Sequence, residues 1–86
     1  MRDLASLRTE IDQLDKQLWE IIGKRMDVVR QIGEWQHAHG ESIMQPQRYQ
    51  EVLKHCKQVG LQYGLSEEVI HEVMNALQTE SIRVES

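Results

Sequence analysis

The chain has 86 residues, 40% of them apolar, and it carries a formal net charge of −4 at pH 7. This length allows one small domain, and the scattered Lys and Arg residues argue against a nucleic-acid partner. No apolar run approaches the ~20 residues that span a bilayer, and no leader resembles a signal peptide. The single cysteine, Cys56, cannot form an internal disulfide. We therefore expect one cytoplasmic domain over residues 1–86, without a membrane partner.

The first predicted element is one long helix, from about Asp3 to about Ala38. This stretch has no proline and only two glycines, and its apolar residues recur at helical spacing. Steps of three and four residues define one stripe of ten positions, of which nine are apolar and one, Arg25, is charged. The stripe consists of Leu4, Leu7, Ile11, Leu14, Leu18, Ile21, Arg25, Val28, Ile32 and Trp35.

Two shorter helices are predicted after a break at residues 39–42. Gln45 and Pro46 open the second helix, because proline suits the first helical position, and we expect this helix to end at Gly60. Ser66 caps the third helix, which continues towards the C-terminus. The apolar faces of these two helices hold Tyr49, Val52, Leu53, Cys56, Val59, Val69, Ile70, Val73, Met74, Leu77 and Ile82. The expected fold class is all-α, with three helices per chain and no strand.

The length of the first helix also predicts an assembly of two chains. A helix of about 36 residues is roughly 54 Å long, whereas a compact chain of this size has a diameter near ~30 Å. The two shorter helices cannot cover such a rod, so the rest of the apolar stripe needs a second copy of the chain. We therefore predict an obligate, intertwined homodimer in which the long helices pack against each other.

Three arginines lie where an anion would explain them. Arg25 interrupts the apolar stripe, and a buried guanidinium needs a negative partner, either an internal carboxylate or a ligand. Arg48 lies in the first turn of the second helix, a poor place for a cation unless it serves something negative. Arg8 and Arg25 are about 26 Å apart along the helix, but an antiparallel dimer brings Arg8 of one subunit near Arg25 of the other. Such a site suits a ligand with two carboxylates, because each guanidinium can bind one of them.

In three stretches the chain resembles the all-helical chorismate mutases. These stretches are LASLRTEIDQLDKQLWEIIGKRMDVVRQIGEW at 4–35, QPQRYQEVL at 45–53 and LSEEVIHEVMNALQTESI at 65–82. The resemblance implies a dimer with two equivalent sites that converts chorismate to prephenate, an isomerase of aromatic amino-acid biosynthesis. This one-substrate rearrangement requires no cofactor, metal or nucleophile. It depends on holding a flexible dianion in its reactive conformation and on stabilising charge at the breaking ether oxygen.

The resemblance also implies which residues bind the substrate. Arg8 of the partner subunit and Arg25 would bind the two carboxylates, and chorismate would be their ligand. The remaining binding positions are Arg48 in the same pocket, Ser81 near a carboxylate, and Gln45 and Tyr49 facing the ring hydroxyl. Tyr49 departs from the family pattern, which often has Glu at this position.

The resemblance implies catalytic roles for Arg25, Gln36 and Glu85. At positions 36 and 85 the residue differs from the one that the family usually has. Gln36 lies three turns after Arg25 on nearly the same face, where the family usually has a lysine that bridges a carboxylate and the ether oxygen. Its amide donates a hydrogen bond but supplies no full charge. Glu85 replaces the Gln of many bacterial relatives, and it helps the ether oxygen only when protonated. We therefore expect weakened catalysis that favours acidic pH.

Other functions stay open from the sequence. The chain could be a regulatory domain that binds chorismate or prephenate without turnover, an isochorismate-pyruvate lyase, or a helical interaction module. It could also be a domain excised from a larger bifunctional enzyme, fused or associated with another enzyme of the aromatic pathway. His37 and His39, at a frayed helix end, are not interpreted as a metal site.

Overall fold

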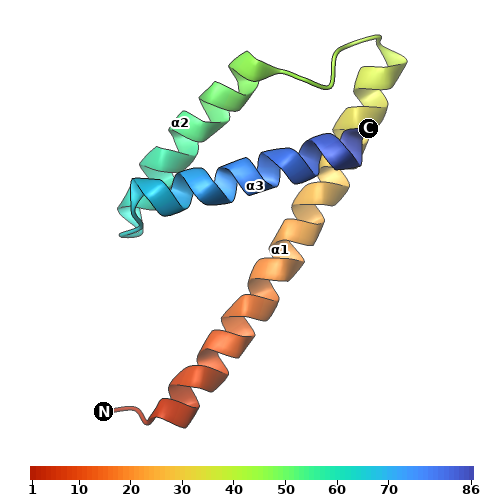
Figure 1. The fold of residues 1–86 in the computed structure, drawn as a ribbon. Helices are drawn as coiled ribbons and strands as arrows, with labels where there is room; N and C mark the ends of the chain where they lie inside the picture. The colour runs from red at the N-terminus through yellow and green to blue at the C-terminus, as the bar shows by residue number, and fades with distance from the viewer.

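The computed structural model shows three helices and no strand (Figure 1). Helix α1 spans Leu4–Ala38, α2 spans Pro46–Gln62 and α3 spans Glu67–Glu85. The prediction of an all-α chain with three helices is confirmed. None of the three is both long enough and apolar enough to cross a membrane.

Side-chain caps fix where α1 and α3 begin. The Asp3 carboxylate accepts a hydrogen bond from the backbone N–H of Ser6 at 2.7 Å. The Ser66 hydroxyl accepts one from the backbone N–H of Val69 at 3.2 Å. Each cap satisfies an N–H group that has no partner within its helix. The expected bounds of the first helix are therefore correct to within one residue.

The predicted end of the second helix at Gly60 is wrong. Helix α2 continues to Gln62, and the chain then turns at Gly64, whose φ of +78° lies in the left-handed region that favours glycine. Gly60 is buried inside the helix, where a Cβ atom would lie only 2.5 Å from Cδ1 of Ile70 in α3. Gly60 thus allows two helices to approach closely rather than ending one of them.

Helix α3 holds the fold together. It contacts both α1 and α2, which do not contact each other. In Figure 1 the C-terminal end of α3 crosses the C-terminal half of α1, and its N-terminal end lies beside α2. The small core between α2 and α3 consists of Leu53, Ile70 and Met74, with Tyr49, Val52, Cys56 and Leu77 packed against it. On α1, the residues buried in the chain are Met26, Val29, Gly33 and Gln36.

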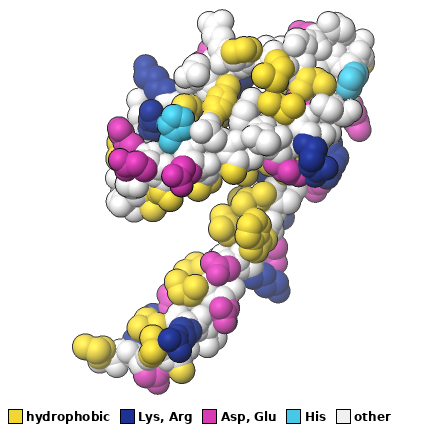
Figure 2. Space-filling view, in the orientation of Figure 1, with side chains coloured by type: hydrophobic (Ala, Val, Ile, Leu, Met, Phe, Trp, Pro, Cys, Tyr) yellow, Lys and Arg dark blue, Asp and Glu magenta, His cyan; other side chains and the backbone are white.

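The N-terminal half of α1 extends away from the other helices as a bare rod (Figures 1 and 2). The molecule therefore measures 57 Å along its longest axis and 15 Å along its shortest. All nine apolar residues of the predicted stripe are exposed, from 41% for Leu7 to 63% for Ile21. Helix α3 covers a neighbouring face of α1 instead, so the stripe is uncovered along its whole length within one chain.

A second uncovered apolar surface lies between α2 and α3. Val59, Val69 and Val73, which the sequence pattern placed on apolar faces, are 37–48% exposed. With Cys56 and Tyr63 they line an apolar groove of about 580 Å³. The apolar spacing of the second helix predicts that it buries Val59, and this prediction is wrong for a single chain, because no part of that chain lies over the groove.

We expect Gly60→Ala to lower the free energy of unfolding by about 1–3 kcal/mol, because the added methyl group overlaps the buried Ile70 side chain. Gly23→Ala is the matched control, since a Cβ atom placed there would have no other atom within 4 Å. It should raise the free energy of unfolding by about 0.5–1 kcal/mol, the usual gain of Ala over Gly inside a helix. Urea unfolding followed by circular dichroism at fixed protein concentration measures both. Equal effects of the two substitutions would contradict the close approach at Gly60.

Candidate active site

A cavity of about 180 Å³ is enclosed by residues of all three helices and of the segment between α1 and α2. Seven of the eight site residues expected from the sequence line it: Arg25, Gln36, Gln45, Arg48, Tyr49, Ser81 and Glu85. The other lining residues are Val29, Ile32, Ile43, Val52, Met74 and Gln78. The fold therefore brings together residues up to 60 positions apart in the sequence, in a pocket whose lining is partly polar and partly apolar.

Arg25 extends from α1 and is held by α3. Its Nη1 donates a hydrogen bond to the Ser81 hydroxyl at 3.1 Å, and this hydroxyl donates to the backbone carbonyl of Leu77 at 2.7 Å. No ion pair of the chain includes Arg25. The sequence left open whether Arg25 meets an internal carboxylate or a ligand. Within one chain no carboxylate pairs with it. The remaining guanidinium donors are available to an anion in the cavity.

The polar lining residues of α2, and Gln45 just before it, are partly exposed. Arg48 Nη1 lies 3.5 Å from a carboxylate oxygen of Glu51, and both side chains are mostly exposed, so this pair adds little stability and leaves Arg48 able to bind a ligand. The Tyr49 hydroxyl donates to Oδ1 of Asn75 at 2.6 Å, which fixes the ring. Gln45 donates from Nε2 to the backbone carbonyl of residue 42 at 2.7 Å.

Two polar side chains at the α1–α3 end of the cavity have oxygens without a partner. Gln36 is only 7% exposed, and its Oε1 accepts no hydrogen bond; the same holds for Oε2 of the half-buried Glu85. Burial raises the pKa of the Glu85 carboxyl. A carboxyl with a raised pKa stays protonated to higher pH, and in that form it can donate a hydrogen bond.

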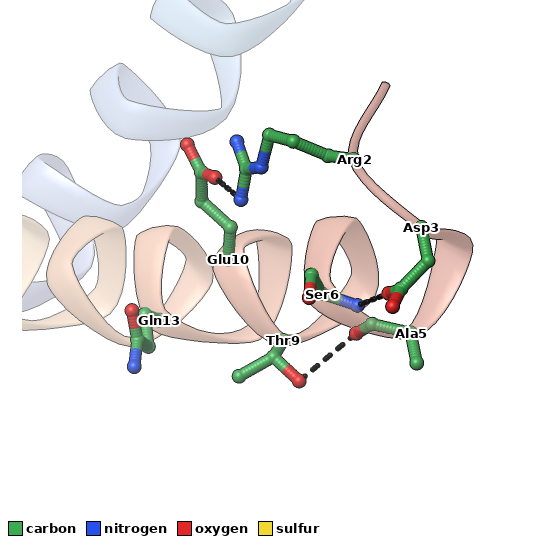
Figure 3. A pocket seen from close by; sticks show the side chains of 7 residues that line it. All are labelled: Arg2, Asp3, Ala5, Ser6, Thr9, Glu10 and Gln13. Carbon is green, nitrogen blue, oxygen red and sulfur yellow. Dashed lines mark hydrogen bonds and ion pairs between the residues drawn. The ribbon is translucent and has the colours of Figure 1, made fainter.

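Arg8 is the one expected site residue that the fold does not bring to the cavity. It lies on the bare half of α1, about 26 Å along the helix from Arg25. A polar hollow at the start of α1 lies nearby (Figure 3), but its charged groups are already engaged. Arg2 pairs with Glu10, and Asp3 caps the helix. The cavity of a single chain therefore lacks Arg8.

The sequence interpretation missed residues that the structure places at the site. Gln78 and Met74 line the cavity, and Asn75 holds Tyr49. Positions 74, 78, 81 and 85 follow helical spacing, so extending the α3 face back from Ser81 would have found Gln78. No sequence signal pointed to Asn75, because its role depends on how α2 packs against α3.

The arrangement favours anion binding and hydrogen-bond donation. Ser81 is held between a guanidinium and a backbone carbonyl, with no base beside it that would make it a nucleophile. No three His, Cys, Asp or Glu side chains of the chain are close enough together to hold a metal ion.

Comparisons with known proteins match nearly the whole chain. The family model described as "Chorismate mutase type II" matches residues 7–86. The T-protein of Haemophilus influenzae is 35% identical over 81 residues, and that of Enterobacter agglomerans is 29% identical over 84 residues. These alignments cover 94% and 98% of this chain but only 22% of each T-protein, so the chain spans about a fifth of their length.

A third relative is closer to this chain in size. The 4-amino-4-deoxychorismate mutase of Streptomyces venezuelae is 31% identical over 83 residues, which cover 96% of this chain and 81% of that protein. The comparison with solved structures gave no significant match.

The burial of Glu85 predicts how stability depends on pH. Its pKa is higher in the folded than in the unfolded chain, so between these two values the folded chain binds more protons and its stability falls as pH rises. Glu85→Gln removes this titration at similar size. We expect the variant to be more stable than the parent at pH 7 and the difference to disappear below about pH 4.

Denaturant unfolding between pH 3.5 and 8, at fixed protein concentration, measures this difference. Glu34→Gln, on the exposed side of α1, controls for the loss of one negative charge from an acidic chain. The same pH dependence in both variants would show that burial at Glu85 is not its cause.

Proposed function

Because this chain belongs to the chorismate mutase type II family, we propose that it converts chorismate to prephenate in aromatic amino-acid biosynthesis. The observation that carries the proposal is the cavity, in which Arg25 has free donors beside apolar residues, the buried Gln36 and the half-buried Glu85. The reaction is an internal rearrangement in which one ether C–O bond breaks and one C–C bond forms. No atom or electron is gained or lost, so binding geometry and charge are all that the site must supply.

Restraint of the substrate is the first contribution. Arg25 and Arg8 of the partner subunit bind the two carboxylates, with Arg48 and Ser81 beside them. The apolar walls, which include Val29 from α1 and Val52 from α2, confine the ring. Fixing both ends of a flexible dianion brings the two reacting carbons together and removes much of the entropic barrier.

Stabilisation of the ether oxygen is the second contribution. As the C–O bond breaks, negative charge develops on this oxygen, and the Gln36 amide and the protonated Glu85 carboxyl donate hydrogen bonds to it. Both are neutral donors, which bind a developing anion less strongly than a lysine does. The rate therefore rises as pH falls through the titration of Glu85, whose burial raises its pKa and extends its protonated range.

Two uncovered apolar surfaces support a homodimer. The stripe along α1 and the groove between α2 and α3 both lie open in one chain. An intertwined pair with antiparallel α1 helices covers the stripe and brings Arg8 of the partner subunit to the cavity. We also propose fusion or association with a second enzyme of the same pathway, because each T-protein is much longer than this chain and has room for another domain.

The lining of the cavity supports chorismate, with its hydroxyl at ring position 4, rather than the 4-amino analogue for which the Streptomyces venezuelae relative is named. An amino group at this position is cationic near neutral pH and is best bound by a carboxylate. Gln45 and Tyr49, assigned to the ring substituent, are neutral, and Glu85 is the one acidic residue of the lining.

The first experiment is product analysis with purified protein between pH 5 and 8. Prephenate formed from chorismate, faster at low pH, is the expected result. Binding of chorismate without turnover would identify a regulatory domain, and salicylate plus pyruvate from isochorismate would identify a lyase. Faster turnover of 4-amino-4-deoxychorismate would overturn the substrate assignment.

Gln36→Lys should raise kcat/KM for chorismate by about 10- to 100-fold, because an ammonium group stabilises the ether oxygen more strongly than an amide. It should also flatten the pH profile, since Glu85 then supplies a smaller share of the stabilisation. Gln31→Lys makes the same chemical change on the exposed side of α1 and should leave the rate unchanged. An equal increase in both variants would indicate a general charge effect, and no increase at position 36 would remove Gln36 from the ether oxygen.

Mixed dimers test the shared site. Arg8→Ala and Arg25→Ala should each reduce activity by more than about 100-fold, because each removes a carboxylate-binding group from both sites. Unfolding the two variants together and refolding them should restore about a quarter of the parent activity, since half of the dimers are mixed and each has one complete site. A mixture that stays as inactive as its components would overturn the shared site.

A further inference from the structure

Helices α1 and α3 make a second contact, at the C-terminal end of each helix. His37 Nε2 lies 3.2 Å from the backbone carbonyl oxygen of Glu85. Glu85 is the last residue of α3, so this carbonyl has no partner within its own helix. A carbonyl can only accept a hydrogen bond, so the contact places a proton on Nε2. His37 of α1 thus caps the end of α3.

Gly33, one turn earlier on α1, brings the two backbones together at the same residue. A Cβ atom at Gly33 would lie 3.0 Å from Cα of Glu85 and 3.2 Å from its Cβ and Cγ. The end of α3 therefore rests directly on the α1 backbone, closer than another side chain would comfortably allow. Gly33 and His37 are four residues apart and so lie on one face of α1.

The Glu85 carboxyl has little else to hold it. No ion pair includes it, and its buried Oε2 has no hydrogen-bond partner. The last turn of a helix is also the part that opens most easily. The place of this carboxyl at the cavity therefore depends on how firmly α1 holds the backbone of Glu85.

We propose that His37 is a positioning residue: by capping the last carbonyl of α3, it holds the Glu85 carboxyl at the cavity, where it donates to the substrate. The effect on turnover rests on the proposed function. The effect on the surroundings of the carboxyl does not, and it is measurable in a protein with no activity at all.

Loss of the cap changes the titration of Glu85 in a defined direction. Arg25 and Arg48 face the cavity from α1 and α2, His37 lies at the backbone carbonyl, and Arg83 of α3 is paired with Glu80. Without His37, the last turn of α3 opens more often and the carboxyl gains water. Its pKa then moves down towards the ordinary value for glutamate, because the burial that raised it is lost.

The test compares three variants at the end of α1. His37→Leu removes the donor, and His37→Gln keeps one near the position of Nε2. His39→Leu is the matched control, because the hydrogen bond and the ring stacking of His39 are both with Trp35 of α1.

We expect His37→Leu to lower kcat about tenfold, with KM changed less than about twofold, because Glu85 acts in the transition state. His37→Gln should recover most of this loss, and His39→Leu should match the parent. Equal losses in the Leu and Gln variants at position 37 would overturn the proposal, as would no loss in either.

Titration of the Glu85 carboxyl by ¹³C NMR, with Glu85→Gln to assign the signal, gives a second readout. The midpoint should fall in His37→Leu and stay near the parent value in His37→Gln. Unchanged midpoints in all variants would overturn the positioning role even if the rates differ. A parent protein that does not convert chorismate would overturn the proposed function, while the titration would still decide on His37.

His37 is exposed, so His37→Leu should fold. His37→Ala repeats the test with a smaller side chain. Loss of folding in both variants would overturn the proposal by showing that the contact is needed for the fold rather than for the placement of one carboxyl.

Discussion

The structure depends on one mismatch, between a first helix of 35 residues and the two helices of 17 and 19 residues that the same chain can fold over it. Helix α3 covers one face of α1, at Met26, Val29 and Gly33, and nothing in the chain covers the adjacent stripe. Exposed apolar surface costs about 25 cal/mol per Å² relative to buried surface, so a stripe of nine large side chains strongly favours association. The same mismatch leaves Arg8 on the uncovered part of the rod, away from the cavity.

Arg25 lies at the boundary between the covered and the uncovered face of α1, and this explains how a cation can lie in an apolar stripe. On its covered side it is bonded to Ser81 of α3, which fixes the side chain without neutralising its charge. On its other side it faces the cavity. The stripe is thus interrupted at the point where α1 faces the cavity, and Ile32 of the stripe and Val29 beside it form part of the cavity wall.

Local patterns in the sequence predicted most of the fold, because caps, proline and helical spacing act over a few residues. The same patterns failed where two elements had to be placed relative to each other. Spacing identified Val59 and Val73 as apolar-face residues but did not show that their own chain leaves them open. A glycine near the end of a helical pattern was interpreted as a stop, although Gly60 serves a close approach to Ile70. Position alone singled out Arg25 and Arg48, whereas the other cavity residues were found because the resemblance to a family supplied the long-range information that periodicity lacks. The roles of all these residues are still predictions.

Helices α1 and α2 form two walls of the cavity without contacting each other. Within one chain each wall packs against α3 and not against the other, so the wall that bears Arg25 and the wall that bears Arg48 are joined through α3. Within one chain, substitutions in α1 and α2 can therefore affect each other's stability only through α3 or through the cavity that they share, whereas either set contacts α3 directly. A chain built in this way can change one wall of its pocket without repacking the opposite one, provided that α3 is kept.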